Sequence, residues 1–385
     1  MHHHSTGGTG EALGRRKKER KDNIVIESEM ETPKSKRVMV AVDDTEVSAY
    51  AFQWALGNFI SEGDYVIVLS AAPYLGIDYP NADMASEYGV PMLATPQDAE
   101  RAEKKVTGHS KQLVNKYLDM CRQKNIACEG EVVKGDAGSW IVDEGERVSA
   151  DAIVVGSNAH GLLARTILGS ISDYVLHNSP CTVVVVRQSE DALCIHDPLS
   201  SQESRKVVIA VDDSKEAIYA FTWALKFFCK PSDNVILYHV HHPYVQPITG
   251  SGTGEFGIEE VYIPPDVSAK DEVESLKESQ KVVEKFMAFA NHESKIKCEG
   301  IVRTGQTEAK VIEGLISLKA DAVVVGTHEK GAVARTFLGS VSDHLAHNSP
   351  CPLIVAKAKK EATIAFDVTP PEHETNNGVA KHHST

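Results

Sequence analysis

The chain carries the same sequence pattern twice. Matching segments lie 169 to 170 residues apart and keep both their residue types and their spacing. The matched pairs are 41–44 with 210–213, 54–56 with 223–225, 128–130 with 298–300, 168–170 with 338–340, and 177–181 with 347–351. Because a repeat of this length is a complete folding unit, the chain is predicted to form two domains of one fold.

Short β-branched runs alternate with segments of helical period in each copy. This order is typical of βαβ units, and strands this apolar are expected to be covered by helices on both faces. Each copy is therefore predicted to be a doubly wound α/β domain with a five-stranded parallel sheet. The expected strands are 37–42, 65–71, 126–133, 152–156 and 182–186 in the first copy, and 206–211, 234–240, 296–302, 322–326 and 352–356 in the second.

Apolar residues at helical spacing predict the helices that cover these sheets. Ala51, Trp54, Ala55 and Phe59 form one stripe after the first strand, so Trp54 and its counterpart Trp223 are expected in the core. A longer helix is predicted in each copy from two further stripes, which are Val106, Leu113, Val114, Tyr117 and Cys121, and Val273, Leu276, Val283 and Met287.

The segments outside the two copies lack an apolar period. Residues 1–35 hold a His run, a Gly-rich stretch and a basic cluster over 15–21, and residues 359–385 are rich in Pro and polar residues. Such segments are predicted to be disordered. The predicted organisation is a tail over 1–35, a first domain over 36–188, a linker over 189–204, a second domain over 205–358 and a tail over 359–385.

Composition and charge exclude several classes of protein. No apolar run in the 385 residues approaches the roughly 20 needed to cross a bilayer. The net charge of -14 disfavours a nucleic-acid partner, because such binding depends on Lys and Arg. Seven cysteines without a C-x-x-C pair predict free thiols in a reducing compartment, with Cys181 and Cys351 buried and inert. We expect a soluble cytoplasmic protein without membrane partners, although the basic cluster leaves a nuclear address open.

A glycine motif follows the fourth expected strand of each copy. Two glycines lie thirteen residues apart, Gly156 and Gly169 in the first copy and Gly326 and Gly339 in the second, and a Ser follows the second glycine. A glycine at a strand end lets a ligand approach the backbone, and Gly-Ser at a helix start presents N–H groups and a hydroxyl to an anion. The motif predicts a phosphate site. The alternative is a helix capping box, because each Ser is followed three residues later by Asp.

These motifs make the chain resemble the universal stress protein family. The resemblance covers both copies and rests on Val-Val-Gly before the motif, Leu-Gly-Ser within it and Asn-Ser-Pro-Cys after it. It implies five-stranded doubly wound domains, some of which bind ATP through a G-x2-G-x9-G-[ST] pattern. It also implies dimers that pair through the last strand, and two tandem copies can form this pseudo-dimer within one chain and pair further into homo-oligomers.

The resemblance implies a role for individual residues. The adenine and ribose end of the site would be lined by Ala41, Asp43 and Ala71 in the first copy and by Ala210, Asp212 and Val240 in the second. The phosphate end would be lined by Gly156, Ala159, Gly169, Ser170 and Ser172, and by Gly326, Gly339, Ser340 and Ser342. The site falls where the first and fourth strands part, at which open α/β sheets bind ligands. Without the resemblance, Asp43 and Asp212 are interpreted as residues that start the next helix.

Both copies depart from the family pattern at its middle glycine. Ala159 stands there in the first copy and Glu329 in the second. A carboxylate about 5 Å from a phosphate is repelled by roughly 3 kcal/mol at an effective dielectric near 20, a cost that Lys330 or a bound cation can offset. We therefore expect ATP or AMP in the first copy, with Mg²⁺ beside the nucleotide left open, and an impaired or empty site in the second.

The predicted function is a non-catalytic stress protein in which ATP or AMP occupancy biases conformation or partner binding. No general base or nucleophile–His pair stands out near the glycines, so ATP hydrolysis is expected to be slow at most. The alternative is an interaction scaffold that has lost nucleotide binding. An ATP-pyrophosphatase is disfavoured because residues 43–46 lack the Ser-Gly-Gly-x-Asp-Ser type of loop that follows the first strand in such enzymes.

Two further patterns are weaker. The segment 252–257 matches G-x-G-x-x-G but opens no helix, so a mobile loop is predicted. His239, His241 and His242 cluster at a strand end, where alternation places His239 and His241 on one face. No carboxylate or Cys is spaced to complete a metal site, so none is predicted.

Overall fold

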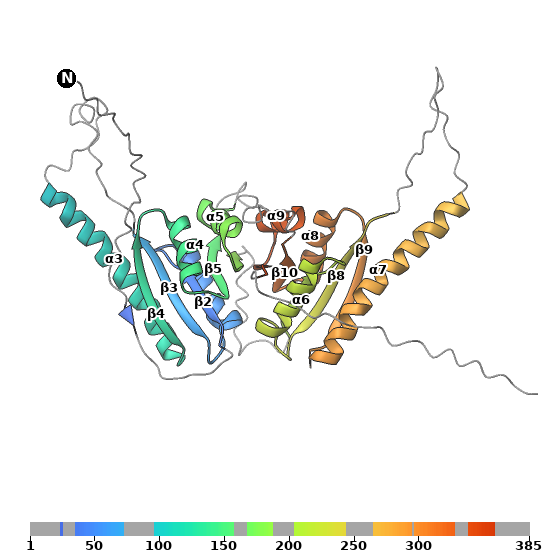
Figure 1. Ribbon diagram of the computed structural model, residues 1–385, viewed down its shortest axis with the longest axis horizontal. Helices are drawn as coiled ribbons and strands as arrows, with labels where there is room; N and C mark the ends of the chain where they lie inside the picture. The colour runs from blue at the N-terminus through green and yellow to red at the C-terminus, as the bar shows by residue number, and fades with distance from the viewer. Residues whose placement is uncertain are drawn as a thin grey trace, which may run out of the picture.

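The computed structural model of the chain describes residues 24–25, 35–72, 96–157, 168–187, 204–243, 265–294, 296–327 and 338–358. They form two halves of the same architecture, which lie side by side in Figure 1. We call residues 35–187 the first repeat and residues 204–358 the second repeat.

One sheet runs through both repeats. Within the described residues it has eleven strands in the order β1-β4-β3-β2-β5-β6-β11-β10-β7-β8-β9. The neighbouring strands of each repeat are parallel, as predicted. The first repeat contributes β2 (Arg37–Ala41), β3 (Tyr65–Ala72), β4 (Ala127–Lys134), β5 (Ala152–Ser157) and β6 (Thr182–Arg187). The second contributes β7 (Lys206–Ala210), β8 (Asn234–His241), β9 (Cys298–Thr304), β10 (Ala322–Gly326) and β11 (Leu353–Ala356).

Helices cover both faces of the sheet, which confirms the doubly wound prediction. One face packs against α1 (Glu46–Trp54), its π-helical continuation η1 (Ala55–Phe59), α3 (Pro96–Gln123), α6 (Lys215–Phe227) and α7 (Pro265–Glu293). The other face packs against α4 (Ala137–Arg147), α5 (Ser170–Asn178), α8 (Thr307–Leu318) and α9 (Ser340–Asn348). The apolar strands alternate between the two resulting core layers, and in β2 Val38 and Val40 face one layer while Met39 faces the other.

Most residues of the predicted helical stripes are buried, whereas Val106, Leu276 and Met287 are only partly buried. Trp54 is only half-buried in its own repeat, and its ring stacks on Phe228 of the second repeat at a centroid distance of 6.3 Å. Val273 was expected to pack on the sheet, but it is 53% exposed. The reason is the length of α7, whose first turns extend beyond the edge of the sheet in Figure 1. Trp223 lies in the core, as expected.

A short strand corrects the prediction for the N-terminal tail. Residues 1–35 were expected to be disordered throughout, but Ile24 and Val25 form β1 (Ile24–Val25), which pairs antiparallel with Gly130 and Glu129 of β4. The outer edge of β4 would otherwise present unpaired backbone groups, and two β-branched residues are suited to pair with it.

The two repeats join through their last strands. β6 and β11 pair antiparallel, with Val184 opposite Ile354, so a pseudo-twofold axis passes between them. This is the pairing within one chain that the sequence analysis expected. Both core layers continue across the junction, because the side chains of β6 and β11 are buried on both faces.

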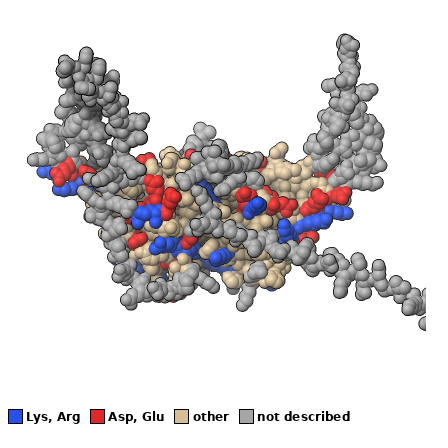
Figure 2. All heavy atoms as spheres, in the orientation of Figure 1, with Lys and Arg blue, Asp and Glu red and all other residues tan. Residues whose placement is uncertain are grey.

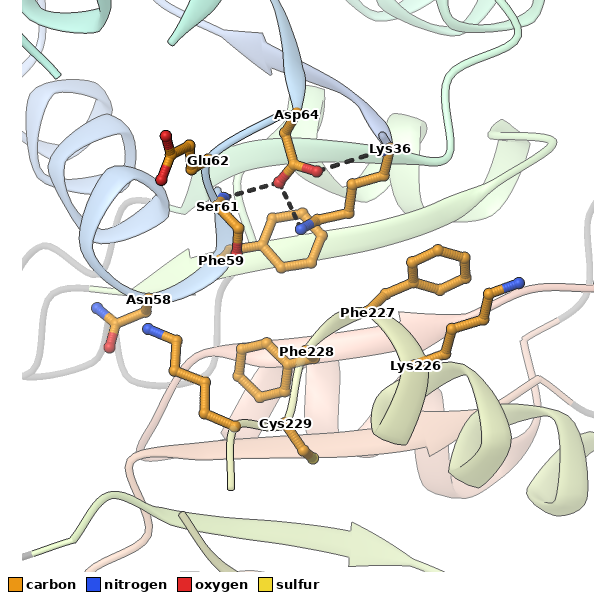
Figure 3. Close-up of a pocket in the computed structure, with 11 residues that line it drawn as sticks. Lys36, Asn58, Phe59, Ser61, Glu62, Asp64, Lys226, Phe227, Phe228 and Cys229 are labelled. Atoms are coloured by element: carbon orange, nitrogen blue, oxygen red, sulfur yellow. Dashed lines mark hydrogen bonds and ion pairs between the residues drawn. The ribbon is translucent and has the colours of Figure 1, made fainter. Parts of the chain in front are cut away.

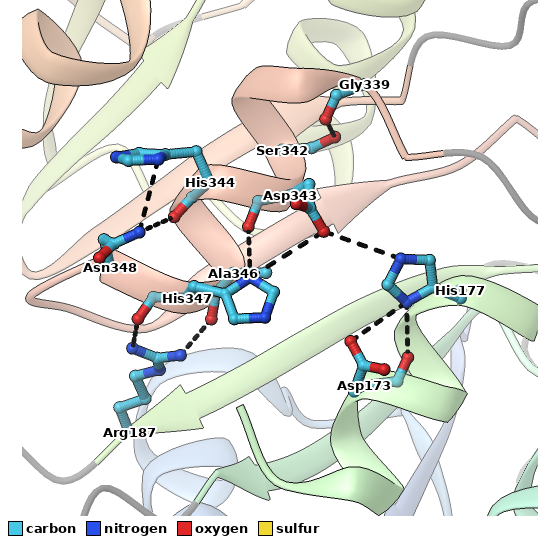
Figure 4. A network of polar contacts seen from close by, with 10 residues as sticks. All are labelled: Asp173, His177, Arg187, Gly339, Ser342, Asp343, His344, Ala346, His347 and Asn348. Carbon is cyan, nitrogen blue, oxygen red and sulfur yellow. Dashed lines mark hydrogen bonds and ion pairs between the residues drawn. The ribbon is translucent and has the colours of Figure 1, made fainter. Parts of the chain in front are cut away.

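Each repeat also caps a helix of the other. Arg187 is the last residue of β6 and donates to the carbonyl of His347 at 2.6 Å and to that of Ala346 at the end of α9 (Figure 4). Its counterpart Lys357 donates to the carbonyls of Leu176 and Ser179 at the end of α5, at 2.5 and 3.1 Å. A cation at a helix C-terminus pairs with the last carbonyls and with the negative end of the helix dipole, so these contacts stabilise the junction.

A cavity of about 240 Å³ lies in the junction at the amino ends of the strands. Figure 3 shows residues of the first repeat on one side, with Lys36 and Asp64 in contact, and those of the second repeat, including Phe228, on the other. Lys36 and Asp64 are buried and form an ion pair with a nitrogen–oxygen distance of 2.6 Å. The cavity is therefore at the opposite edge of the sheet from the predicted nucleotide site.

Candidate functional site

The predicted site residues of each repeat meet at the carboxyl edge of the sheet. Ala41 ends β2, Ala71 lies near the end of β3, and Gly156 lies near the end of β5. β2 pairs with both neighbours, with Ala41 opposite Leu69 and Val40 opposite Val154. After β2 the chain forms β3 and β4 on one side of it, and then crosses to form β5 and β6 on the other side. The strand order therefore reverses between β2 and β5, and open sheets bind ligands at such a switch point. In the second repeat Ala210, Val240 and Gly326 hold the equivalent places.

The glycine at the end of the fourth strand is required by helix packing. A Cβ atom on Gly156 would lie 3.0 Å from Cγ1 and 3.1 Å from the carbonyl oxygen of Val47 in α1. On Gly326 it would lie 2.5 Å from the carbonyl oxygen of Glu216 in α6. These glycines therefore let the first helix of each repeat approach the sheet, whereas the sequence analysis had assigned them to ligand approach.

The second glycine of each motif is the residue that precedes a helix. Gly169 is the N-cap of α5 and Gly339 is the N-cap of α9, so Ser170 and Ser340 are the first helical residues. The alternative interpretation of these serines as capping-box residues is therefore wrong. Among the described residues, no side chain caps α5, and Ser170 is exposed. The first N–H groups of α5 are left for another acceptor, which is the arrangement that binds anions.

Ser172 and Ser342 stabilise the first turns of α5 and α9. Each is buried, and its hydroxyl donates to the carbonyl of the N-cap glycine, at 2.8 Å to Gly169 and 2.9 Å to Gly339. These hydroxyls therefore hold the helix start in place, a role that sequence reasoning did not assign to them.

Ser157, which sequence reasoning missed, lies between these two parts of the motif. It is the last residue of β5, its side chain is 1% exposed, and its hydroxyl has no hydrogen-bond partner among the described residues. Strand alternation places it on the face of Val155, which packs with α5, and opposite to Gly156. A buried polar group without a partner is unfavourable, so this hydroxyl fits a ligand atom at the phosphate end of the site.

Asp43 and Asp212 lie at the other end of the site and are exposed. Oδ1 of Asp43 accepts from the backbone N–H of Thr45 at 3.0 Å and from its hydroxyl at 2.5 Å. Oδ1 of Asp212 accepts from the N–H of Ser214 at 2.9 Å. Both aspartates thus position the residue that caps the next helix, and this turn uses only one oxygen of each carboxylate.

Several residues of the sequence analysis lie outside the described residues. These are Ala159, Glu329, Lys330 and the segment 252–257.

His239 and His241 of the second repeat contact different partners. Nδ1 of His239 lies 2.8 Å from the carbonyl oxygen of Val211. His241 is buried between Ser279, at 2.9 Å, and Glu272, at 3.2 Å. Within the described residues, no group of three His, Cys, Asp or Glu side chains is arranged to hold a metal ion.

Glu308 is a second residue that sequence reasoning missed. It lies in the first turn of α8, the helix that packs beside α9. Its own backbone N–H, followed by the side chain of Ser340, holds the pKa of the carboxyl below its usual value, with smaller contributions from His344 and His242. The only sequence signal was a difference between the copies, because the first repeat has Gly138 at the same position.

Charge and hydropathy of the described residues bear on possible partners. On the face shown in Figure 2, both acidic and basic side chains of the described residues are exposed. No described helix is both long and apolar enough to span a membrane. Cys181 and Cys351 are buried, as predicted, and burial raises the pKa of Cys351 to about 12, which disfavours its reactive thiolate form.

A buried acidic cluster lies away from the site, between β4 and α4 of the first repeat. The carboxyl groups of Glu131 and Glu144 share Arg147, which lies 3.1 Å from Glu131 and 2.5 Å from Glu144. Burial, followed by the Glu144 carboxyl, raises the pKa of Glu131 to about 7, and Arg147 opposes this shift. The second repeat has Ile301, Gly314 and Ser317 at these positions, so the cluster belongs to the first repeat alone.

This cluster predicts that stability falls as pH rises toward 7. An unfolded Glu ionises near 4.5, whereas native Glu131 keeps its proton until about 7, so the native state binds more protons between these values. Glu131 therefore adds on the order of 1–3 kcal/mol to the free energy of unfolding below pH 4.5, and this stabilisation is lost as the pH rises through 7. Urea unfolding from pH 5 to 8 should show a steeper fall for the wild type than for Glu131→Gln. Equal slopes would contradict the prediction.

Comparison with known proteins identifies the family. The sequence model of the Universal stress protein family matches residues 34–187 and again residues 203–357. Since these matches cover most of the chain, the protein belongs to the Universal stress protein family and is a tandem of two family domains.

Relatives of one and of two domains were found. Universal stress protein Sll1388 of Synechocystis sp. is 27% identical over 154 residues, which is 39% of this chain and 97% of that protein. A universal stress protein of Mycolicibacterium smegmatis is 22% identical over 325 residues, 84% of this chain and 97% of that protein. The crystal structure of a universal stress protein from Archaeoglobus fulgidus covers 84% of this chain and 98% of its own, with 18% identity and a TM-score of 0.51. This structural match supports the fold.

Proposed function

We propose that this chain is a non-catalytic stress-response protein that binds an adenine nucleotide, ATP or AMP, in its first repeat. The observation that carries the proposal is the unpartnered Ser157 hydroxyl, buried at the switch point on the side of the uncapped start of α5. A phosphate oxygen can accept from this hydroxyl and from the first N–H groups of α5. Asp43 at the end of β2 is placed to accept from a ribose hydroxyl.

The site is suited to binding rather than to catalysis. Of the residues described at this edge, Ser157, Ser170 and Asp43 are not paired with a histidine base. Phosphoryl transfer needs a positioned nucleophile and metal ligands, so any ATP hydrolysis would be slow. We further propose that occupancy biases how the chain pairs with partners, that the two domains span 36–188 and 205–358, and that the protein is cytoplasmic.

Calorimetric titration of ATP and AMP into the full chain tests the proposal through Gly169→Asp. A Cβ atom on Gly169 meets only Oγ of Ser172, at 3.3 Å, and Asp is a favourable N-cap residue, so this variant should fold with unchanged or higher stability. Its carboxylate would repel a phosphate and lower the affinity by about a hundredfold or more. Gly169→Asn is the matched control, because it keeps the size and the cap without the charge.

Ser157→Ala provides an independent variant in the same titration. Removing an unpartnered hydroxyl should leave the melting temperature unchanged or raise it, while the loss of one hydrogen bond to a charged phosphate lowers the affinity about tenfold. A wild type that takes up neither nucleotide, or a Gly169→Asp chain that binds as tightly as the wild type, would remove the proposed function and leave the scaffold interpretation.

A further inference from the structure

The two ends of the eleven-stranded sheet differ in what borders them. At one end β1 pairs antiparallel with Gly130 and Glu129 of β4. At the other end β9 is the last strand, and no described strand pairs with its outer edge. An edge strand without a neighbour presents backbone N–H and C=O groups that can pair with another extended chain.

The free edge repeats the sequence that β1 covers. Residues 128–130 and 298–300 both read Cys-Glu-Gly, and they lie opposite matched positions of β3 and β8. Gly130 and Gly300 also pack alike on the long helix of their repeat, since a Cβ atom on either would lie 2.3 Å from a valine Cγ1. The outer edge of β9 is therefore built like the edge that accepts β1.

β9 is also more exposed than its counterpart. No residue of β4 is exposed, whereas four of the seven residues of β9 are exposed. Two apolar side chains of β9 are only partly buried, with Ile301 in one core layer and Val302 in the other. A strand added along this edge would pair with the backbone and cover apolar side chains on both faces.

We propose that the outer edge of β9 is a docking site for an extended aliphatic segment of a partner protein, which adds a strand antiparallel to β9. The first repeat indicates the chemistry of this segment, because its Cys-Glu-Gly edge pairs with the β-branched residues Ile24 and Val25. A glutamate in the edge is compatible with this pairing, since Val25 lies opposite Glu129. Such strand addition takes its affinity from main-chain hydrogen bonds.

The source of the segment follows from how β1 is tethered. Each chain has one β1, and its connection to β2 keeps it at a high effective concentration beside β4 of the same chain. The β1 of a second copy would have to leave that partner to reach β9. The edge of β9 is therefore left for a different protein, and this docking does not require the nucleotide proposed for the first repeat.

A synthetic peptide of residues 21–28 tests the proposal on the full chain. The wild type should bind one peptide per chain, because the edge of β4 is already paired. At about ten times the half-saturating concentration of peptide, amide hydrogen exchange over residues 298–302 should slow about tenfold. The matched control is the same peptide with Val25→Pro, which lacks one backbone donor and should give no protection.

Val25→Pro in the chain itself provides the second comparison. This change lies outside both repeats and should free the edge of β4, so the variant should bind two peptides, with protection over 128–132 as well as over 298–302. Protection confined to 128–132 in either protein, or no protection in both, would refute docking at β9. Self-association of the wild type that rises with protein concentration and is lost in Val25→Pro would assign the edge to a second copy and overturn the proposal.

Discussion

An Asp64→Ala variant is expected to unfold with a free energy about 3–5 kcal/mol below that of the wild type. Asp64 is 5% exposed and Lys36 is 4% exposed, so removal of the carboxylate leaves a buried ammonium without its partner. The same carboxylate accepts from the backbone N–H groups of Ser61, at 2.7 Å, and Lys36, at 3.2 Å, and both would also lose their acceptor. Urea unfolding followed by tryptophan fluorescence measures the loss.

The second repeat contains an equivalent buried ion pair, and an exposed ion pair at the surface serves as the control. Asp233 holds the same place in the second repeat, where it pairs with Arg205 at 2.6 Å, so Asp233→Ala should cost a similar amount. The exposed pair of Glu100 and Lys104 is expected to contribute little to stability, as measured with Glu100→Ala. An Asp64→Ala chain no less stable than Glu100→Ala would show that the buried pair contributes little to the free energy of unfolding. Replacing both partners by Lys36→Met and Asp64→Leu should recover much of the loss.

The strands and most helices could be predicted because their signals are local. In β6 four consecutive valines, 183–186, form an apolar β-branched run, and the structure buries every residue of the strand. The N-caps at Thr45 and Asp136 are also local, since each accepts from a backbone N–H three residues later. Such bonds depend only on spacing along the chain, although the sequence analysis did not assign these two residues as caps.

The remaining features depend on contacts between distant segments. Arg187 binds carbonyls about 160 residues away, and a terminal Arg on a strand gives no sequence signal for such a partner. The pairing of Ile24 with β4 and the exposure of Val273 follow from where the sheet ends. Ser157 lies within the motif, but its importance comes from a missing hydrogen-bond partner, which only the packing reveals.

The strand-end glycines show how a correct position can be given the wrong reason. Sequence reasoning assigned Gly156 and Gly326 to a ligand, whereas the structure fills the space beside them with the first turn of α1 or α6. A loss of nucleotide binding in a Gly156 variant would therefore not establish a ligand contact, because the helix that begins after Asp43 would move as well. Stability must be measured before binding is interpreted.

Gly326→Ala is expected to lower the free energy of unfolding by about 3 kcal/mol, and Gly156→Ala by about 1–3 kcal/mol. The order follows from what the new methyl group meets, which is rigid backbone of Glu216 at 2.5 Å in the second repeat and atoms of Val47 at 3.0 Å or more in the first. Gly57→Ala is the matched control, because a Cβ atom there meets nothing within 4 Å, and it should be neutral or slightly stabilising. Thermal unfolding of the three variants measures the order. If Gly326→Ala were as stable as Gly57→Ala, α6 would not be packed against β10 as closely as the structure shows, and the assignment of this glycine to a ligand would stand again.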